Sequence, residues 1–422
     1  MNKAGEPSAQ PPPEKSLPQL ATPSRAAAGL KAVGVTARLV GEMGVMRGVK
    51  ALLAVNQKDG FDCQSCAWPS PDGERHVFEF CENGAKAVAD EATTKKIGRE
   101  FFAAHSVAAL AAESDHWLNA QGRLVEPMVL RPGALHYAPI GWDEAFTLIA
   151  AELRALPTPD AAAFYTSGRT SNEAAFLWQL FARQFGTNNL PDCSNMCHES
   201  SGVALHESIG IGKGTVTLED FEHADAIFVI GQNPGTNHPR MLASLAAAKA
   251  RGAKIVSVNP LPEIGIERFK NPQDFMNPLK AFQTLLGEGA RLSDLWLQPR
   301  IGGDLALLKG LMKEMLEAEA ARPGNVLDEN FLREHTAGFE ALAADLGRTP
   351  WDEIVEAGGV ARDAIRAAAE IAIQSRATIC CWAMGLTQQP DAVATIQQVV
   401  NFLLLRGSIG RRGAGVCPVR GH

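Results

Sequence analysis

The chain has 422 residues, of which 46% are hydrophobic, and its formal net charge is -7 at pH 7. This length exceeds what one hydrophobic core usually organises, so we expect more than one domain. The acidic balance disfavours nucleic acid as a partner, and no window holds the roughly 18 uninterrupted apolar residues of a transmembrane segment.

The first part of the chain predicts little regular structure. Residues 1–26 are rich in Pro, Ala, Ser and Glu, which is typical of a disordered leader. One short helix is expected over residues 48–55. The chain has eight cysteines and no apolar targeting segment after Met1, which favours a cytoplasmic location and cysteines that serve as ligands.

A cysteine module follows. Cys63 and Cys66 have the two-residue spacing that lets two thiolates reach one metal centre, and Cys81 supplies a third sulfur. The residues alone leave two interpretations open. One is an iron–sulfur site, and the other is a zinc ribbon in which His76 completes a Cys3His set.

Beyond residue 142 the pattern becomes α/β. A short apolar run over residues 161–165 predicts a strand, and residues 174–185 have helical spacing. Thr170 with Glu173 fits a capping box at the start of that helix. The loop between strand and helix is either a seat for phosphate or an ordinary helix cap.

The next segment places a cysteine beside a histidine. Cys197 offers a thiolate, which is a soft metal ligand, and His198 can take or hold a proton near neutral pH. Such a pair also occurs as packed core. Taken alone, the pair therefore supports either a redox metal site or plain packing.

A clearer βαβ unit comes next. Residues 226–230 and 254–258 predict buried parallel strands with a helix over 239–250 between them, and 377–382 predicts a further strand. Residues 300–372 are expected to be mainly helical. The expected parts are residues 1–54, a leader and variable segment, 55–110, the cysteine module, 111–192, the first part of an α/β domain, and 193–422, a second α/β domain.

Polar, glycine-containing loops follow these strands. They span residues 166–172, 231–238, 259–260 and 384–389, and loops at the carboxyl ends of parallel strands converge on a ligand-binding crevice. No GxGxxG or Walker sequence occurs, so NAD and ATP are disfavoured as ligands.

The order of these motifs resembles the molybdopterin oxidoreductases over residues 55–422. The motifs are the CxxC module, TSGR-x-SNE, C-x3-C-H, GQNPGTNHP, CWAMGLTQ and GAGVCPVRG. Within that family the chain looks like the formate dehydrogenase-like alpha subunits. The resemblance implies parallel sheets flanked by helices, a small Fe–S module with a [4Fe-4S] cluster, and molybdenum or tungsten held by bis-molybdopterin guanine dinucleotide.

The resemblance also implies roles for single residues. Cys197 falls on the metal ligand, His198 on the active-site histidine, and Arg420 on the arginine that orients a substrate carboxylate. Lys86 resembles the lysine that bridges cluster and pterin. The implied cluster ligands are Cys63, Cys66 and Cys81, and the implied cofactor-binding residues are Ser167, Arg169, Asn172, Gly231, Asn233, Asn237, Asn259, Met384, Gly385 and Gln388.

Two features depart from the family pattern. Ser70 replaces the third cysteine of the usual C-x2-C-x3-C run, which leaves an oxygen ligand, a [3Fe-4S] cluster or no cluster as alternatives. The chain also stops at an active-site motif, so we expect an amino-terminal portion of a longer enzyme.

The functional expectation is two-electron oxidation of formate or a similar small substrate. Electrons would pass through the cluster to a redox partner protein or another acceptor. The alternatives are a non-catalytic truncated subunit or cofactor-binding scaffold, completed by a carboxyl-terminal chain, and a zinc-stabilised α/β interaction protein.

Overall fold

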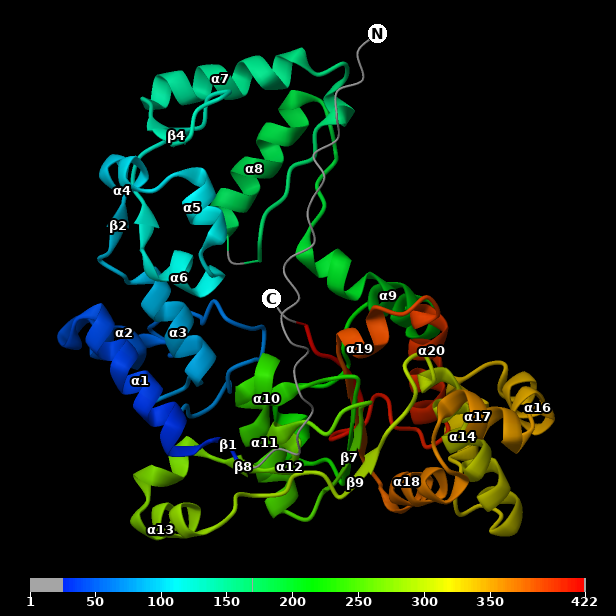
Figure 1. Ribbon diagram of the computed structural model, residues 1–422. Helices are drawn as coiled ribbons and strands as arrows, with labels where there is room; N and C mark the ends of the chain where they lie inside the picture. The colour runs from blue at the N-terminus through cyan, green and yellow to red at the C-terminus, as the bar shows by residue number, and fades with distance from the viewer. Residues whose placement is uncertain (1–25, 169, 421–422) are drawn as a thin grey trace.

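The computed structural model describes residues 26–168 and 170–420 (Figure 1). Its centre is a five-stranded sheet in the order β11-β10-β6-β7-β9, and all neighbouring strands run parallel. The predicted α/β class with a parallel sheet is confirmed. The strands are β6 (Ala226–Ile230), β7 (Lys254–Val258), β9 (Leu295–Leu297), β10 (Thr378–Trp382) and β11 (Gly415–Pro418).

Helices cover both faces of this sheet. All five residues of β6 are buried, because Phe228 and Ile230 face one core and Ile227 and Val229 face the other. The larger core also contains residues of α9 (Cys193–Ile209), α14 (Asp304–Ala321), α18 (Arg362–Gln374) and α20 (Ala392–Leu404). The second core contains α11 (Pro239–Ala250).

The predicted elements of this body are confirmed. Both strands and the helix of the βαβ unit have the expected bounds, and β10 begins one residue late. The region predicted to be helical holds α14, α15 (Glu329–His335), α16 (Phe339–Arg348), α17 (Trp351–Gly358) and α18. The loops after β6 and β10 contain two short helices that were not predicted, α10 (Pro234–Asn237) and α19 (Met384–Thr387).

The amino-terminal part is more helical than predicted. Instead of one short helix it has α1 (Gly29–Met43) and α2 (Val45–Ala54), which pack against each other and against α3 (Glu82–Glu91). Gly44, with φ of 83°, makes the turn between the first two helices. The pairing of β1 (Ala27–Ala28) with β8 (Phe269–Lys270) joins this part to the sheet body.

Residues 99–187, which we call the upper segment, lie above the sheet body in Figure 1. The segment consists of helices and has one antiparallel strand pair, β4 (Met128–Val129) with β5 (Ala138–Pro139). The parallel pair β2 (Lys96–Ile97) and β3 (Arg123–Leu124) lies at its base. Its helices are α4 (Arg99–Ala104), α5 (Val107–Ala112), α6 (Asp115–Ala120), α7 (Trp142–Ala155) and α8 (Asn172–Phe185).

Two predictions in the upper segment are wrong. Residues 161–165 form no strand, because the segment beside them makes only one backbone bond to the run, from the Phe164 N–H to the Asn189 carbonyl, and a single bridge between Thr166 and Asp192. The cap of α8 is Ser171, whose hydroxyl accepts from the Ala174 N–H, so Thr170 is not the capping residue. The boundaries between domains stay a prediction.

Short elements complete the described chain. They are α12 (Ile264–Glu267), α13 (Pro278–Leu286) and the 3-10 turns at Pro159–Ala161, Glu219–Glu222 and Pro272–Met276. Across the part of the chain that the structure describes, no helix is both long enough and apolar enough to traverse a bilayer.

Candidate functional site

The carboxyl ends of β6 and β10 meet at the switch point of the sheet. From β6 the strand order proceeds to β7 and β9 on one side and to β10 and β11 on the other. The Gly385 N–H donates to the Gly231 carbonyl at 3.0 Å, so the two loops touch through their backbones. A Cβ atom on Gly385 would lie 2.5 Å from the Gly231 Cα, which is why glycine is needed there.

A cavity of about 680 Å³ lies at these strand ends. It brings together eight of the residues predicted from the sequence. They are Cys197, Gly231, Asn233, Asn237, Asn259, Met384, Gly385 and Gln388. The same cavity is lined by Gln232 and Gln389, which lie in two of the predicted loops, and by Asn83, Glu263 and Asp304, which sequence reasoning missed.

Cys197 lies in the first turns of α9. The Asp192 carboxylate caps this helix by accepting from the Asn195 N–H at 2.7 Å. The backbone leaves helical geometry at His198, so α9 is kinked directly after the cysteine. The Gln388 amide donates to the Met196 carbonyl at 2.9 Å and thereby holds the loop after β10 against this turn.

His198 is buried, and both of its ring nitrogens have partners. Nε2 lies 3.1 Å from the Val419 carbonyl oxygen, which can only accept, so Nε2 carries the proton. Nδ1 lies 3.0 Å from the Ser201 hydroxyl, which in turn accepts from the Trp382 indole N–H at 2.9 Å. Burial, followed by the nearby Arg420 charge, lowers the pKa of His198 to about 4, so the ring is neutral.

A second buried imidazole, His238, was not predicted from the sequence. Its Nε2 lies 2.8 Å from the Arg420 carbonyl, and its Nδ1 lies 3.5 Å from the Gln232 side-chain nitrogen. Two imidazoles from different elements therefore bind the consecutive carbonyls of Val419 and Arg420. The Asn-His-Pro sequence before α11 was the available signal, but only the fold brings it beside residue 420.

Two glutamine oxygens in the cavity lack a partner. Gln232 and Gln389 line the cavity, and the side-chain oxygen of each is buried without a hydrogen bond. The nitrogen of Gln389 donates to the Asp304 carboxylate at 3.0 Å, and burial raises the pKa of Asp304. Unpaired buried acceptors are costly, so a ligand with N–H donors would suit this wall.

The structure does not bring every predicted residue to this cavity. Ser167 and Asn172 lie in the upper segment and do not line it, and Arg169 lies outside the described residues. Lys86 is exposed on α3 and forms an ion pair with Asp90 at 2.7 Å. The cofactor and bridging roles assigned to these residues stay predictions.

The three cysteines of the module come close together at the start of α3. A Cβ atom on Gly84 would lie 2.9 Å from the Cys63 sulfur and 3.9 Å from the Cys81 sulfur, so both sulfurs border one small volume. Cys66 is close enough to Cys81 to interact with it electrostatically. Burial raises the pKa of Cys81 to about 11 and also raises that of Cys66, so thiolates here need a compensating positive charge.

The zinc interpretation is not supported. Within residues 26–168 and 170–420, no three His, Cys, Asp or Glu side chains are arranged around a single metal ion, and this holds for the three cysteines both alone and with His76. The backbone N–H of His76 donates to the Glu79 carboxylate at 3.1 Å. The Cys3His set is therefore not formed.

These features define an α/β protein with a ligand cavity at its sheet switch point and a cysteine in the wall of that cavity. The profile of the family described as molybdopterin oxidoreductase matches residues 123–420. The chain belongs to the molybdopterin oxidoreductase family.

Several relatives support this assignment. An uncharacterized oxidoreductase of Mycobacterium tuberculosis is 56% identical over 94% of this chain and 50% of its own length. Protein YdeP of Escherichia coli is 47% identical over 94% of this chain and 52% of its own. Formate dehydrogenase H of E. coli is more distant, at 31% identity over 71% of this chain and 38% of its own.

A solved structure shows the same fold. Acetylene hydratase from Pelobacter acetylenicus has a TM-score of 0.53 and 21% identity, covering 70% of this chain and 37% of that one. The names of the similar proteins specify different reactions, so the fold does not decide the substrate. The chain spans about half the length of the M. tuberculosis oxidoreductase and of YdeP.

Proposed function

We propose that the cavity at the ends of β6, β7 and β10 holds molybdenum or tungsten bound to two pterin guanine dinucleotides, and that the protein oxidises formate or a similar small substrate. The observation that carries this proposal is that Cys197 lines the same cavity as the three strand-end loops. The bound group supplies the two-electron redox chemistry. The proposal also rests on the membership of the chain in the molybdopterin oxidoreductase family.

The cavity wall fits such a group. Cys197 offers a soft thiolate to the metal. The oxygens of Gln232 and Gln389 are buried acceptors that the N–H groups of guanine or pterin would satisfy. Gly231 and Gly385 have no side chains, so their backbones leave room for a phosphate to approach closely.

His198 and His238 hold the backbone that carries Arg420. Because the Nε2 proton of each ring is engaged by a carbonyl, their first task is to fix residues 419 and 420. Arg420 does not line the cavity itself, and it is from the family resemblance that we infer a charge-assisted contact of its guanidinium with a substrate carboxylate. The neutral His198 ring keeps its proton on Nε2 in this arrangement.

Cys63, Cys66 and Cys81 would hold an iron–sulfur cluster, which would supply one-electron transfer out of the site. Asn83, two residues after the last of these cysteines, lines the cavity. Its side-chain nitrogen donates to the Thr236 carbonyl in α10 at 2.7 Å, which joins the cysteine module directly to the cavity wall. A redox protein or a soluble acceptor then receives the electrons.

Formate-dependent dye reduction tests the proposal. Cys197→Ala should abolish the reduction, whereas Cys193→Ala, at the start of the same helix, should retain most of it. Molybdenum, tungsten and pterin are measured in each preparation. Full activity in Cys197→Ala would refute the role of this thiol.

The second candidate is a cofactor-binding scaffold without turnover, completed by another chain. It is favoured by the upper segment, where α7 and α8 expose large apolar side chains such as Trp142 and Phe176. A scaffold would contain metal and pterin but would reduce no dye until a complementing chain was added.

A further inference from the structure

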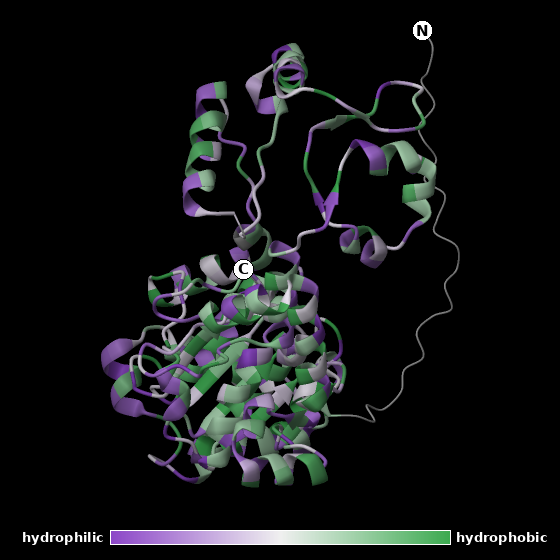
Figure 2. Cartoon of the chain, turned by 90° about the vertical axis from the view of Figure 1, so that its left-hand side faces the viewer, coloured by the Kyte–Doolittle hydropathy of each residue, from purple (hydrophilic) through white to green (hydrophobic). Residues whose placement is uncertain are grey.

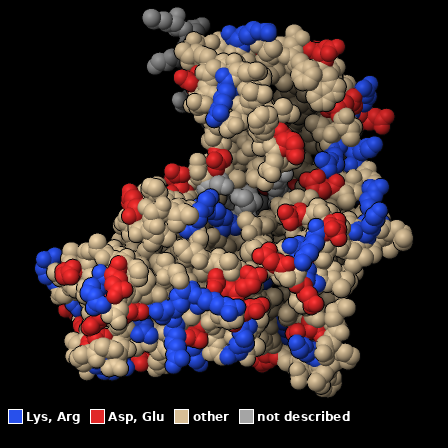
Figure 3. Space-filling view, turned by 180° about the vertical axis from the view of Figure 1, so that it is seen from behind, with Lys and Arg blue, Asp and Glu red and all other residues tan. Residues whose placement is uncertain are grey.

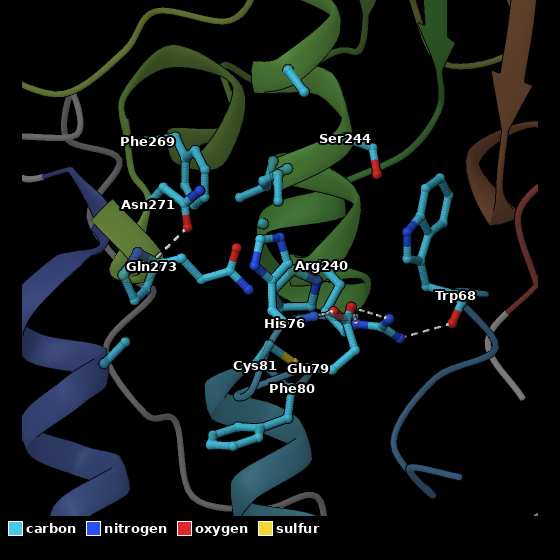
Figure 4. A pocket seen from close by; sticks show the side chains of 18 of the residues that line it. Trp68, His76, Glu79, Phe80, Cys81, Arg240, Ser244, Phe269, Asn271 and Gln273 are labelled. Atoms are coloured by element: carbon cyan, nitrogen blue, oxygen red, sulfur yellow. Dashed lines mark hydrogen bonds and ion pairs between the residues drawn. The ribbon is translucent and has the colours of Figure 1, made fainter. Parts of the chain in front are cut away.

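Ser70 replaces the third cysteine of the usual C-x2-C-x3-C run. Its hydroxyl oxygen already has a hydrogen-bond partner in this structure. The Ser70 oxygen accepts from the Arg240 guanidinium at 3.3 Å. Arg240 also donates to the Trp68 carbonyl at 3.1 Å and to the Glu79 carboxylate at 3.2 Å (Figure 4). A single arginine of α11 therefore holds the loop that runs from the second cysteine to the third.

This arrangement is buried. The side chains of Arg240 and Glu79 are 11% and 9% exposed, and they form an ion pair beside a cavity of about 290 Å³ that Cys81 also lines. Moving Ser70 toward an iron would take an acceptor from a buried guanidinium. In this structure the Ser70 hydroxyl oxygen therefore contacts the guanidinium of the buried ion pair.

Backbone N–H groups contact two of the three cysteine sulfurs. The Ser65 N–H points to the Cys63 sulfur at 3.4 Å, and the Gly84 N–H points to the Cys81 sulfur at 3.4 Å. Hydrogen bonds to cysteine sulfurs are among the features that tune iron–sulfur clusters.

A buried asparagine links the two parts of the loop that carry these cysteines. The Asn56 side chain accepts from the Cys63 N–H at 2.9 Å and donates to the Glu79 carbonyl at 2.7 Å. This side chain therefore ties the backbone at Cys63 to the segment that leads to Cys81.

We propose that the cluster is held by three thiolates, those of Cys63, Cys66 and Cys81, and that one iron corner has no protein ligand. The buried pair of Arg240 and Glu79 anchors the loop in place of a fourth ligand. This inference rests on the proposed function, because it assumes that the cysteine module binds an iron–sulfur cluster.

An iron without a protein ligand should exchange reversibly. When ferricyanide takes one electron and one Fe²⁺ leaves, [4Fe-4S]²⁺ becomes [3Fe-4S]⁺. One electron from dithionite followed by one added Fe²⁺ restores the four-iron cluster, so charge and electrons balance in both directions. The three thiolates stay bound throughout.

The test compares anaerobically purified full chains by iron and sulfide analysis and by electron paramagnetic resonance. Wild type and Ser70→Ala should give the same [3Fe-4S]⁺ signal after ferricyanide and the same recovery with Fe²⁺ and dithionite. Ser244→Ala, whose side chain lines the cavity beside Arg240 and Cys81, is the control. Cys81→Ala should lose most of the iron and the signal.

Three outcomes would overturn the inference. A changed or lost signal in Ser70→Ala alone would make Ser70 a ligand. Four irons that no treatment removes from the wild type would indicate a fourth protein ligand. Absence of iron from a wild type that contains molybdenum or tungsten and pterin would remove the cluster but leave the proposed cofactor cavity standing, whereas absence of all these components would contradict both.

Discussion

The sheet body and the upper segment contain similar amphipathic helices but bury them very differently. In the body, α14, α18 and α20 contribute fully buried residues to one core with the sheet. In the described residues of the upper segment, only Phe164, Ala182 and Thr187 are buried. Figure 2 shows hydrophobic bands on isolated upper helices, and Figure 3 shows wide areas there without charged side chains.

The difference teaches that apolar spacing predicts a helix but not its partner. Trp142, Phe146 and Ile149 lie along one face of α7, yet all three are exposed, at 64%, 60% and 56%. In the sheet body, the apolar faces of helices such as α14 and α20 pack in one core with the sheet. The upper segment therefore has the pattern of a core without an opposing layer in the described chain.

The largest expected difference in unfolding free energy is between substitutions of a tryptophan in the sheet body and one in the upper segment. Trp382→Ala removes a fully buried side chain and its bond to Ser201, and we expect a loss of about 3–5 kcal/mol in the free energy of unfolding. Trp142→Ala in α7 should cost less than about 0.5 kcal/mol. Urea denaturation followed by circular dichroism measures both, and equal losses would show that the upper segment has a core of its own.

A smaller effect should come from the loop contact at the switch point. Gly385→Ala places a Cβ against the Gly231 backbone and should cost about 1–3 kcal/mol. Gly347→Ala, at a helical position of α16 with no atom within 4 Å, should instead stabilise by about 0.5–1 kcal/mol. Thermal unfolding of the two variants would contradict this account if both changes had the same sign.

Loss of a histidine side chain should also cost more stability in the sheet body than in the upper segment. His238→Ala leaves the Arg420 carbonyl without its buried donor, with an expected loss of about 1–3 kcal/mol. His136→Ala removes an exposed contact to the Phe102 carbonyl in the upper segment and should change stability by less than about 0.5 kcal/mol. Denaturant midpoints of both variants test this, and the reverse ranking would be inconsistent with the positions of these rings.

The smallest expected effect concerns carboxylates of the body and depends on pH. Burial raises the pKa of Asp304, so ionisation of its side chain opposes folding once the pH exceeds the unfolded value. Asp304→Asn should therefore raise stability at neutral pH, and the gain should vanish in acid. Asp345 has a pKa lowered by its bond to Lys309, so Asp345→Asn should lower stability at neutral pH. Melting temperatures of both variants, measured from acid to neutral pH, test this. A loss of stability in Asp304→Asn and a gain in Asp345→Asn at neutral pH would contradict these pKa shifts.

The sequence was sufficient where one element carries its own signal. The strands β6 and β7 and the helix α11 were predicted because apolar runs are local features, whereas the eight cavity residues were implied by the family resemblance. Partners distant in sequence were not predictable. His238 and Arg420, and likewise Ser70 and Arg240, meet only after the sheet has formed.

The same limit explains the errors in the upper segment. Residues 161–165 are apolar enough for a strand, but the segment beside them supplies only the bond from Phe164 to Asn189 and the bridge from Thr166 to Asp192, which is too little for a ladder. The capping box failed by one residue, because both Thr170 and Ser171 can cap and only geometry selects between them.

The central claim is that Cys197 binds a molybdenum or tungsten ion in the cavity at the ends of β6 and β10. X-ray absorption at the metal edge of wild type, Cys197→Ser and Cys193→Ser tests it most directly. The account predicts one sulfur ligand fewer in Cys197→Ser and an unchanged spectrum in Cys193→Ser. Bound metal with identical spectra in all three proteins, or a wild type without either metal, would contradict it.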